Sequence, residues 1–299
     1  MTHNSQNNLG EGSVGKLLFK LALPAIVAQV VNLLYNMVDR IYIGHIPGEG
    51  DIALTGLGLA FPIIMLVTAF SSLVGAGGAP QAAIAMGRNQ KEKAERILGN
   101  CTLALIIIAV LLCVILEIYA EPLLYLFGAS AATLPYALEY LRIYLAGTVC
   151  VMLSLGLNTF ITTQGYAQVA MKTVLIGAIS NIVLDPIFIF GLGPAPKMGV
   201  AGAALATLIS TGSVLLVLYY WMFVKKDTYL NPYLSNFKFS RQISLDILGV
   251  GIPASLEMIM TATFAAFFST ILAIVAGTDA VAVYSTGWRG VNIGMMPTL

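Results

Sequence analysis

The chain has 299 residues, of which 58% are hydrophobic and 10% are charged, and its formal net charge is +1. Because a soluble domain usually carries about 25% charged residues, this composition excludes an ordinary soluble protein and predicts a membrane protein. No basic patch with interleaved aromatic residues occurs, which excludes nucleic acid as a partner. We therefore expect an all-α polytopic protein whose first partner is the lipid bilayer.

The cysteines and histidines argue against a metal or redox site. Cys101, Cys113 and Cys150 fall inside apolar segments, at a spacing that matches no metal site. The two histidines lie in a polar tail, at His3, and in a loop, at His45. These positions argue against a histidine-dependent intramembrane protease, and we predict neither enzyme activity nor a cofactor.

Helices that cross the ~30 Å hydrocarbon core of a bilayer need about 20 apolar residues. Eight segments reach this length, at residues 16–44, 52–84, 97–119, 133–163, 169–192, 198–224, 244–276 and 280–299. The connectors between them are short and polar. The pattern predicts eight membrane-spanning helices.

Lysine and arginine gather on one side of this predicted bundle. They occur near the first segment and after the second, fourth and sixth, at Lys16, Lys20, Arg88, Lys91, Lys93, Arg96, Lys172, Lys225, Lys226, Lys238 and Arg241. Only Arg40 and Lys197 lie near loops of the opposite side. Because cytoplasmic loops carry the excess of basic residues, we predict that the N-terminus and the even-numbered connectors are cytoplasmic.

The start of the seventh segment repeats the start of the first. LALPAIVAQVV is echoed by GVGIPASLEMI, which pairs Pro24 with Pro253, and Asp51 pairs in the same way with Asp279. Six segments separate the two starts, so both repeats would cross the membrane in the same direction. Parallel six-helix halves are a known transporter design.

The repeat divides the chain into four parts. We predict a cytoplasmic tail (1–15), a first six-helix lobe (16–224), a cytoplasmic linker (225–243) and the start of a second lobe (244–299). The second unit stops at GMMPTL, inside its second helix. We therefore expect the chain to be part of a longer protein with four more helices.

Two carboxylates lie within long apolar segments. Asn32, Asn36 and Asp39 follow one another at spacings of four and three residues, which places the three side chains on one helical face. Asp185 follows Asn181 by four residues, so these two are neighbours on their helix. An ionised carboxylate in hydrocarbon costs at least ~2.5 kcal/mol on insertion scales, which favours a functional role for both.

The chain directions place Asp39, Asn181 and Asp185 in the outer half of the membrane, at a depth similar to Tyr140 of the fourth segment. Burial and a neighbouring like charge both favour the neutral form of a carboxyl group, so one of the two would exchange a proton near neutral pH. The same oxygens, with the Asn181 carbonyl, also suit Na⁺, a hard cation that prefers oxygen ligands. These four residues are the predicted cation or proton site, and the residues alone leave both ions open.

Other polar positions are candidates for further roles. Asn36, Asn158 and Thr207 are predicted substrate contacts, although such side chains also form interhelical hydrogen bonds in membranes. Glu257, in the inner half of the seventh segment, is a second candidate for substrate charge, or pairs locally with a neighbour. Pro24 removes an internal hydrogen bond and would let the first helix bend, or would give a static kink.

Several segments together resemble the multidrug and toxic compound extrusion (MATE) transporters. The resemblance rests on LALPAIVAQVVNLLYNMVDRIYIGHI, GRNQKEKAERILGN, NTFITTQGYAQVAMK, NIVLDPIFIFGLG and MGVAGAALATLIS, which occur in the family's order. It implies twelve helices in two six-helix lobes that face a central cavity. It also implies cation-coupled export of amphipathic, often cationic compounds across a prokaryotic plasma membrane, by a protein that we predict to be a monomer.

The resemblance assigns residues by position. Asp39 and Asp185 match the family's first-lobe carboxylates, and Asn181 matches the asparagine one turn before the second. Tyr140 resembles a tyrosine near that site, and Pro24 matches the proline associated with helix bending. Glu257 resembles the acid that some subfamilies carry in the seventh helix.

The leading hypothesis is a multidrug efflux antiporter that exchanges organic cations for H⁺ or Na⁺. A flippase for lipid-linked precursors, from the same broad superfamily, usually needs basic cavity residues, whereas the first-lobe charges here are mostly acidic. The remote alternative is an intramembrane aspartyl protease, in which two aspartates share a proton. Neither Asp39 nor Asp185 lies in a GxGD pattern.

Overall fold

The computed structural model describes residues 13–193, 195–225, 228–230 and 236–261, with the single positions 263, 264, 267, 268, 271 and 275. The labelled elements are α1 (Val14–Gly44), α2 (Gly50–Gly87), α3 (Lys91–Leu126), α4 (Leu134–Ala146), α5 (Thr148–Thr163), α6 (Ala167–Phe190), α7 (Val200–Tyr219) and the π-helix η1 (Tyr220–Val224). A further helix follows at Arg241–Thr261. No strand occurs in these described ranges, and the predicted all-α fold class is confirmed.

The chain is a multi-pass membrane protein. Six helices are long and apolar enough to cross a membrane, and α4 with α5 forms one additional, bent span. These seven spans correspond to the first seven predicted segments. The eighth, 280–299, lies outside the described residues, as does Asp279 of the proposed repeat. The division of the chain into two lobes stays a prediction.

Helices α2 and α3 extend beyond the apolar segments that predicted them. The third segment was expected at 97–119, but α3 has 36 residues, which correspond to a length of about 54 Å. Its first turns are charged, and Arg96 donates to Glu92 one turn earlier, over 2.6 Å. Hydropathy marks only the part of a helix that lies in hydrocarbon, so it misses the polar turns that continue the helix into water.

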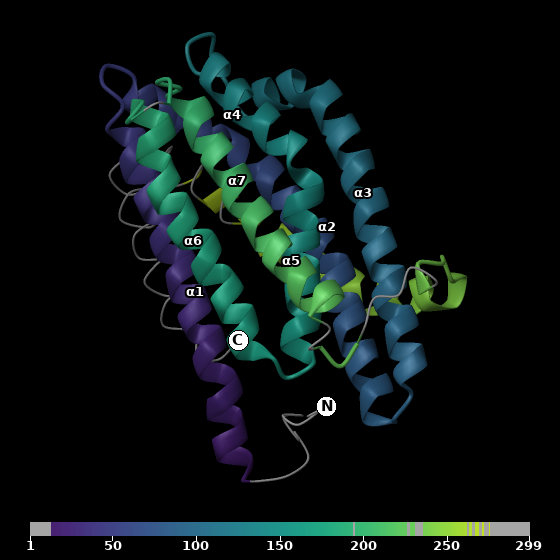
Figure 1. The fold of residues 1–299 in the computed structure, drawn as a ribbon. Coiled ribbons are helices and arrows are strands. Elements are labelled where there is room, and N and C mark those ends of the chain that lie inside the picture. Colours follow the sequence, from purple (N-terminus) through teal and green to yellow (C-terminus); the bar gives the residue numbers. More distant parts are fainter. Residues whose placement is uncertain are drawn as a thin grey trace.

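Two groups of helices make up the bundle (Figure 1). On one side α1 packs against α6 and α6 against α7, and on the other α2 packs against α3 and α5. The bent span contacts both groups, because α4 and α5 each touch α2 and α7. Helix α1 makes only slight contact with α2.

The fourth predicted segment, 133–163, is not one straight helix. Its two parts, α4 and α5, meet at Gly147 with a bend of 58°. The Thr148 hydroxyl donates to the carbonyl of Leu145 over 2.7 Å, and such a bond competes with the regular helical pattern. A Cβ at Gly147 would overlap the side chain of Leu208 in α7, so glycine allows the close approach of α7 at the bend.

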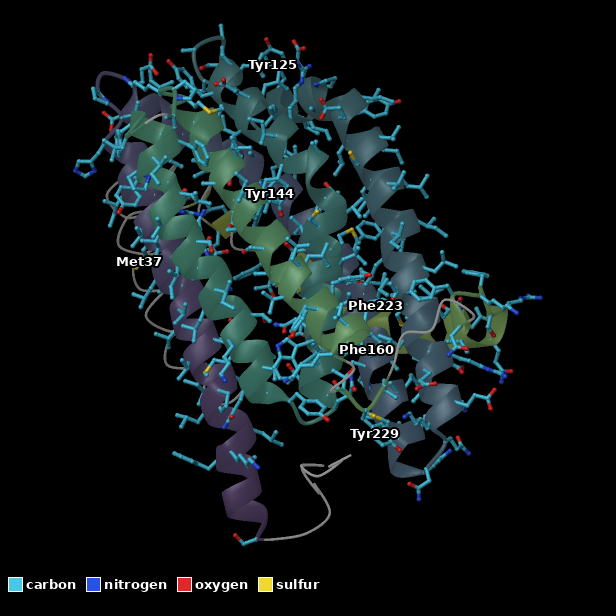
Figure 2. The ribbon with its side chains drawn as sticks, in the orientation of Figure 1. Met37, Tyr125, Tyr144, Phe160, Phe223 and Tyr229 are labelled. Atoms are coloured by element: carbon cyan, nitrogen blue, oxygen red, sulfur yellow. The ribbon has the colours of Figure 1, made fainter. Side chains whose placement is uncertain are left out.

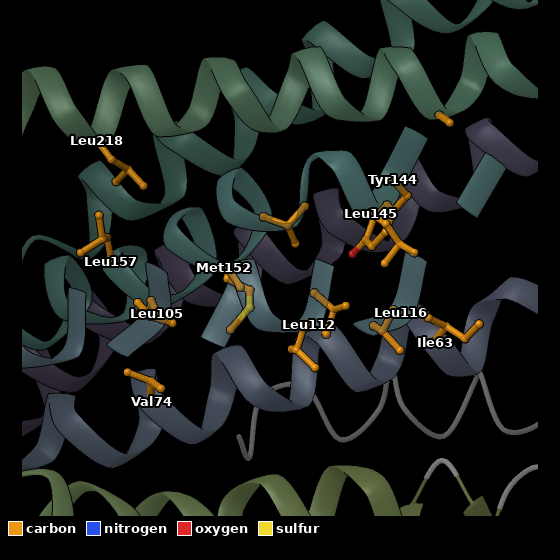
Figure 3. Packing of buried hydrophobic residues seen from close by; sticks show 14 of the residues in the cluster. Ile63, Val74, Leu105, Leu112, Leu116, Tyr144, Leu145, Met152, Leu157 and Leu218 are labelled. Carbon is orange, nitrogen blue, oxygen red and sulfur yellow. The ribbon is translucent and has the colours of Figure 1, made fainter. Parts of the chain in front are cut away.

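The apolar core lies mainly between α2, α3 and α5 (Figure 3). Leu105 of α3 and Met152 of α5 are fully buried, and Val74 of α2 is almost so. Burial of such a side chain contributes roughly 1.5–3 kcal/mol. Gly156 faces Leu105 closely enough that a Cβ would overlap it. This core holds α2, α3 and α5 together as one of the two groups of helices.

We call the end of the bundle with Arg88, Lys91, Lys93 and Arg96 the basic end. The connector after η1 is attached there, since the amide of Leu230 donates to Oε1 of Gln164 over 2.8 Å. Leu230 is fully buried. Figure 2 shows Tyr229 near Phe160 and Phe223 at this end, far from Tyr125.

The connector is also held by α3. The side chain of Asn100 donates to the carbonyl of Lys238 over 3.3 Å and accepts from the hydroxyl of Ser244. The Lys91 ammonium lies 5.1 Å from the ring centroid of Tyr229. The connector is therefore built into the basic end by bonds at several points.

Helix Arg241–Thr261 packs backbone to backbone on α2. A Cβ at Gly251 would overlap the carbonyl oxygen of Leu73, and one at Gly77 would overlap the carbonyl oxygen of Ile247. Gly77 and Gly251 also face each other, because a Cβ on Gly77 would lie 3.1 Å from the Cα of Gly251. Small residues at membrane helix contacts permit such close approach.

Candidate functional site

A cavity of about 330 Å³ lies between α1, α2, the bent span, α6 and α7. Its polar wall comes from several helices at once: Asn32, Tyr35, Asn36, Asp39, Arg40, Thr68, Tyr140, Tyr144, Ser154, Asn158, Thr207, Ser210 and Thr211. Figure 2 shows Tyr144 inside the bundle, between the labelled residues of its two ends. A cavity of this size, lined by both apolar and polar side chains, can hold a small molecule.

The stripe on α1 faces this cavity as its spacing predicted. Asn32, Asn36 and Asp39 all line the wall. The side chain of Asn36 donates to the carbonyl of Asn32 over 2.6 Å. Asp39 is 8% exposed, whereas both asparagines are exposed. The carboxyl group is therefore the recessed end of the stripe.

The sequence predicts one ion site that contains both carboxylates, and the structure places the two at different positions relative to the cavity. Asp39 lines the cavity, whereas Asp185 is fully buried behind its wall in α6. They remain close enough for their charges to interact. Asn181, 1% exposed, donates through Nδ2 to Oδ1 of Asp185 over 3.2 Å. Helix α7 packs on α6 and covers Asn181 and Asp185. The sequence of α6 alone does not reveal this burial.

Thr207 of α7 connects the buried pair with the cavity. Its hydroxyl oxygen lies 3.4 Å from Nδ2 of Asn181, as a second acceptor for that amide. Thr207 also lines the cavity, as does Tyr140. The side chains of Thr207, Asn181 and Asp185 therefore form a polar path from the cavity wall into α6.

Three buried oxygen atoms in this region have no hydrogen-bond partner within the described part of the chain. They are Oδ1 of Asp39, Oδ1 of Asn181 and Oδ2 of Asp185. An unsatisfied buried acceptor usually costs about 1–3 kcal/mol, so such a group calls for an explanation. Three such oxygens in one region have the chemistry of a site for a proton or a hard cation. They are the atoms that the sequence predicted for Na⁺.

Tyr140 lies on the predicted wall together with Tyr144. Their rings stack one turn apart on α4, with centroids 6.4 Å apart and an interplanar angle of 14°. Both are buried. Asn158 also lines the wall, and its Oδ1 accepts from the Thr173 hydroxyl over 3.2 Å.

The remaining predicted residues lie away from this cavity. Pro24 is buried within α1, which remains helical through it. Glu257 is exposed on helix Arg241–Thr261 and does not line the cavity wall described above. The roles of both residues stay predictions.

Several residues of the cavity wall were not predicted, and three of them are instructive. Tyr35 precedes Asp39 by one turn, a spacing that already indicated the same face. Arg40 was interpreted only as a residue near an outer loop, and Phe61 resembled any apolar residue of the second segment. For Arg40 and Phe61 the sequence carries no signal that distinguishes a cavity wall from lipid.

Comparisons with known proteins show which family of proteins the chain resembles. The MatE family profile matches residues 24–187, which include α1 from Pro24 onward, the helices α2 to α5, most of α6 and both carboxylates. A FAD transporter of Shewanella oneidensis is 27% identical over 205 residues, which cover 69% of this chain and 45% of the relative. The multidrug export protein MepA of Staphylococcus haemolyticus is 26% identical over 281 residues, 93% of this chain and 60% of MepA.

A solved structure extends the likeness to the whole fold. An outward-facing multidrug resistance MATE transporter of the MOP superfamily superposes with a TM-score of 0.89 at 33% identity. It covers 100% of this chain, which spans 64% of the solved one. The chain thus spans about half to two thirds of the length of the proteins it matches. Since the profile covers more than half of its residues, this chain belongs to the MatE family of membrane transporters.

Proposed function

We propose that the protein is an efflux antiporter that exchanges amphipathic organic cations for H⁺ or Na⁺. The observation that carries this proposal is the set of three partnerless buried oxygens, on Asp39, Asn181 and Asp185, beside the cavity. A carboxylate on a cavity wall attracts an organic cation and the coupling ion alike. If the organic cation and the coupling ion compete for that carboxylate, binding of one releases the other, and this provides the exchange.

Coupling follows from the charge of the site. Two nearby carboxylates repel each other when both are ionised, and a bound proton or Na⁺ relieves that repulsion. Ion binding then removes the negative charge that holds the substrate cation. This is a coupling free energy between two ligands, so each must weaken the binding of the other by the same factor.

The relatives support a transport function but differ in the compound that their names give. MepA is named a multidrug export protein, whereas the Shewanella protein is named a FAD transporter. The preference for organic cations is therefore proposed from the carboxylate of Asp39. The cytoplasmic N-terminus is proposed from the lysine and arginine pattern.

The test is dye transport in proteoliposomes that contain the complete protein, with H⁺ and Na⁺ gradients imposed separately. We expect a cationic dye to move against one of the gradients, and we expect Asp39→Asn to abolish this movement. Asp51→Asn is the matched control, because Asp51 is exposed at the start of α2, outside the cavity. Full transport by an Asp39→Asn, Asp185→Asn double variant would refute the proposal. If neither gradient moves a dye, lipid translocation is the next assay.

A further inference from the structure

An ion pair joins α3 and α4 on the outside of the bundle. Nε of Arg142 in α4 lies 3.3 Å from Oε1 of Glu117 in α3. The two side chains are 57% and 42% exposed, so the pair is not enclosed by the helices around it. Both residues lie between apolar neighbours, in LRI and ILEI, and charged side chains are costly where they face hydrocarbon. A charge pair at such a position therefore needs an explanation.

The pair lies on the side of α4 that faces away from the cavity described above. Tyr140 and Tyr144 line that cavity, and each lies two residues from Arg142. Two residues on an α-helix are separated by about 200°, so Arg142 leaves α4 on the opposite side. Beside the pair, the apolar side chains of Val114 and Ile118 of α3 are exposed. In a membrane protein this outer, apolar surface is in contact with lipid.

The depth of the pair follows from its place along α3. Glu117 lies two residues before the end of the apolar segment 97–119, which is long enough to cross the hydrocarbon core. Tyr119 and Tyr125 are exposed on the same part of α3, and tyrosine is enriched where a bilayer meets water. Figure 2 shows Tyr125 at the end of the molecule opposite to the basic end. The pair therefore lies at the level of the lipid headgroups, in the leaflet away from the basic end.

A groove of about 350 Å³ runs along this side of α4. Its lining consists of residues at helical spacing: Pro135, Leu138, Glu139, Arg142 and Ile143. Glu139 is exposed and forms no ion pair within the described part of the chain. A guanidinium has five N–H donors, and one carboxylate oxygen near Nε of Arg142 cannot accept from all of them. The groove therefore offers donors and a carboxylate one turn apart.

We propose that this groove binds the headgroup of phosphatidylethanolamine in the leaflet away from the basic end. The lipid phosphate accepts from the guanidinium of Arg142, whose planar fork matches two phosphate oxygens. The lipid ammonium donates to the carboxylate of Glu139. The acyl chains then extend toward the middle of the membrane, beside the exposed Val110 and Val114 of α3. This site is separate from the cavity and does not depend on the proposed transport function.

Three simpler roles for the charges make different predictions. If the ion pair only ties α3 to α4, its removal changes stability and leaves lipid binding unchanged. If Arg142 acts only as a positive charge, anionic phosphatidylglycerol binds more tightly than phosphatidylethanolamine. If another part of the complete protein covers the groove, no lipid binds there. The proposed site instead prefers phosphatidylethanolamine to phosphatidylcholine, because the trimethylated nitrogen of choline has no N–H to donate to Glu139.

The test compares lipids that have the same acyl chains and differ only in the headgroup. The complete protein in detergent is titrated with phosphatidylethanolamine, phosphatidylcholine or phosphatidylglycerol, and the bound lipid is counted by native mass spectrometry. We expect Arg142→Gln to weaken the binding of phosphatidylethanolamine at least about tenfold, since hydrogen bonds between charged groups are the strong class. We expect Glu139→Gln to remove the preference for phosphatidylethanolamine over phosphatidylcholine.

Two further variants complete the experiment. Arg142→Lys keeps the charge but loses the fork, so we expect it to recover the binding of phosphatidylethanolamine only in part. Glu121→Gln is the matched control, because Glu121 is an exposed acid near the same end of α3 that does not line the groove. We expect it to bind all three lipids as the wild-type protein does. Thermal unfolding without added lipid shows whether each variant is folded.

Each of three results would overturn the proposal. The first is equal binding of phosphatidylethanolamine and phosphatidylcholine by the wild-type protein. The second is unchanged lipid binding in a folded Arg142→Gln variant, and the third is tighter binding of phosphatidylglycerol than of phosphatidylethanolamine. Because lipid binding is measured without any gradient, a failure of dye transport would refute the antiporter and leave the lipid site in place.

Discussion

Asn181 holds Asp185 from one helical turn away, through a hydrogen bond of 3.2 Å between two side chains that are almost completely buried. The same amide group also reaches the hydroxyl of Thr207. The pair is thus closed to water but connected to the cavity wall.

Asn181→Leu should change the response to the coupling ion, in opposite directions for Na⁺ and H⁺. It removes the donor to Asp185 and one of the three partnerless oxygens. Loss of an oxygen ligand should raise the half-saturating Na⁺ concentration at least about tenfold. Loss of the donor favours the protonated form of Asp185, so the half-saturating H⁺ concentration should fall. Transport rate as a function of ion concentration measures this. Asn36→Leu, on the cavity wall, should leave the ion response in place. An unchanged ion response in Asn181→Leu would contradict the assignment of the pair.

Thr207→Val should reduce coupling while it preserves side-chain volume. It removes the hydroxyl that lies between Asn181 and the cavity wall. A neutral hydrogen bond contributes about 1 kcal/mol, so we expect about a fivefold loss in the ion-driven transport rate. Thr207→Ser should restore most of it. Thr211→Val is the control, because that hydroxyl bonds only to the carbonyl of Thr207 within its own helix. Equal effects of both valine variants would indicate a packing change instead.

Gly251→Ala should destabilise the protein, because its Cβ would overlap the backbone of α2 at Leu73. Overpacking of this kind typically costs about 1–3 kcal/mol, and a backbone oxygen cannot turn aside. Gly249→Ala, two residues earlier, meets open space. It should be neutral or stabilising by up to about 1 kcal/mol through helix propensity. Thermal unfolding in detergent compares them, and a Tm for Gly251→Ala at or above the wild-type value would show that the two helices separate freely.

Gln164→Leu should loosen the connector at the basic end. It leaves the buried amide of Leu230 without its acceptor, at a cost of about 1–3 kcal/mol. Gln164→Glu keeps an acceptor and loses only the donor to Phe160, so it should retain most of the protection. Hydrogen exchange at the Leu230 amide provides the measurement. Equal protection in the leucine variant would mean that the other contacts hold the connector.

The sequence predicted best those features that depend on one helix alone. The spans follow from length and apolar content, and the stripe of Asn32, Asn36 and Asp39 follows from helical spacing. The pairing of Asn181 with Asp185 is likewise a one-turn relationship.

Features that depend on the neighbouring helices were not predicted. Only the packing of α7 reveals that Asp185 lies behind the cavity wall and that Thr207 connects it to the cavity. The bend at Gly147 lies where Leu208 of α7 approaches closely, and a glycine in an apolar run does not disclose this contact. Arg40 and Phe61 meet across two helices, so their spacing along the chain carries no information about the contact.

The attachment of the connector has a mechanical consequence. Asn100 holds Ser244 at the base of helix Arg241–Thr261, and Gly77 faces Gly251 a few residues further. If helix Arg241–Thr261 moved relative to α2, it would therefore rotate about its own first turn, near Ser244. The helix has 21 described residues, about 30 Å in length, so a tilt of about 10° would displace its far end by about 5 Å. The helix would stay fixed at the basic end, and its distance from α2 would change most at the opposite end.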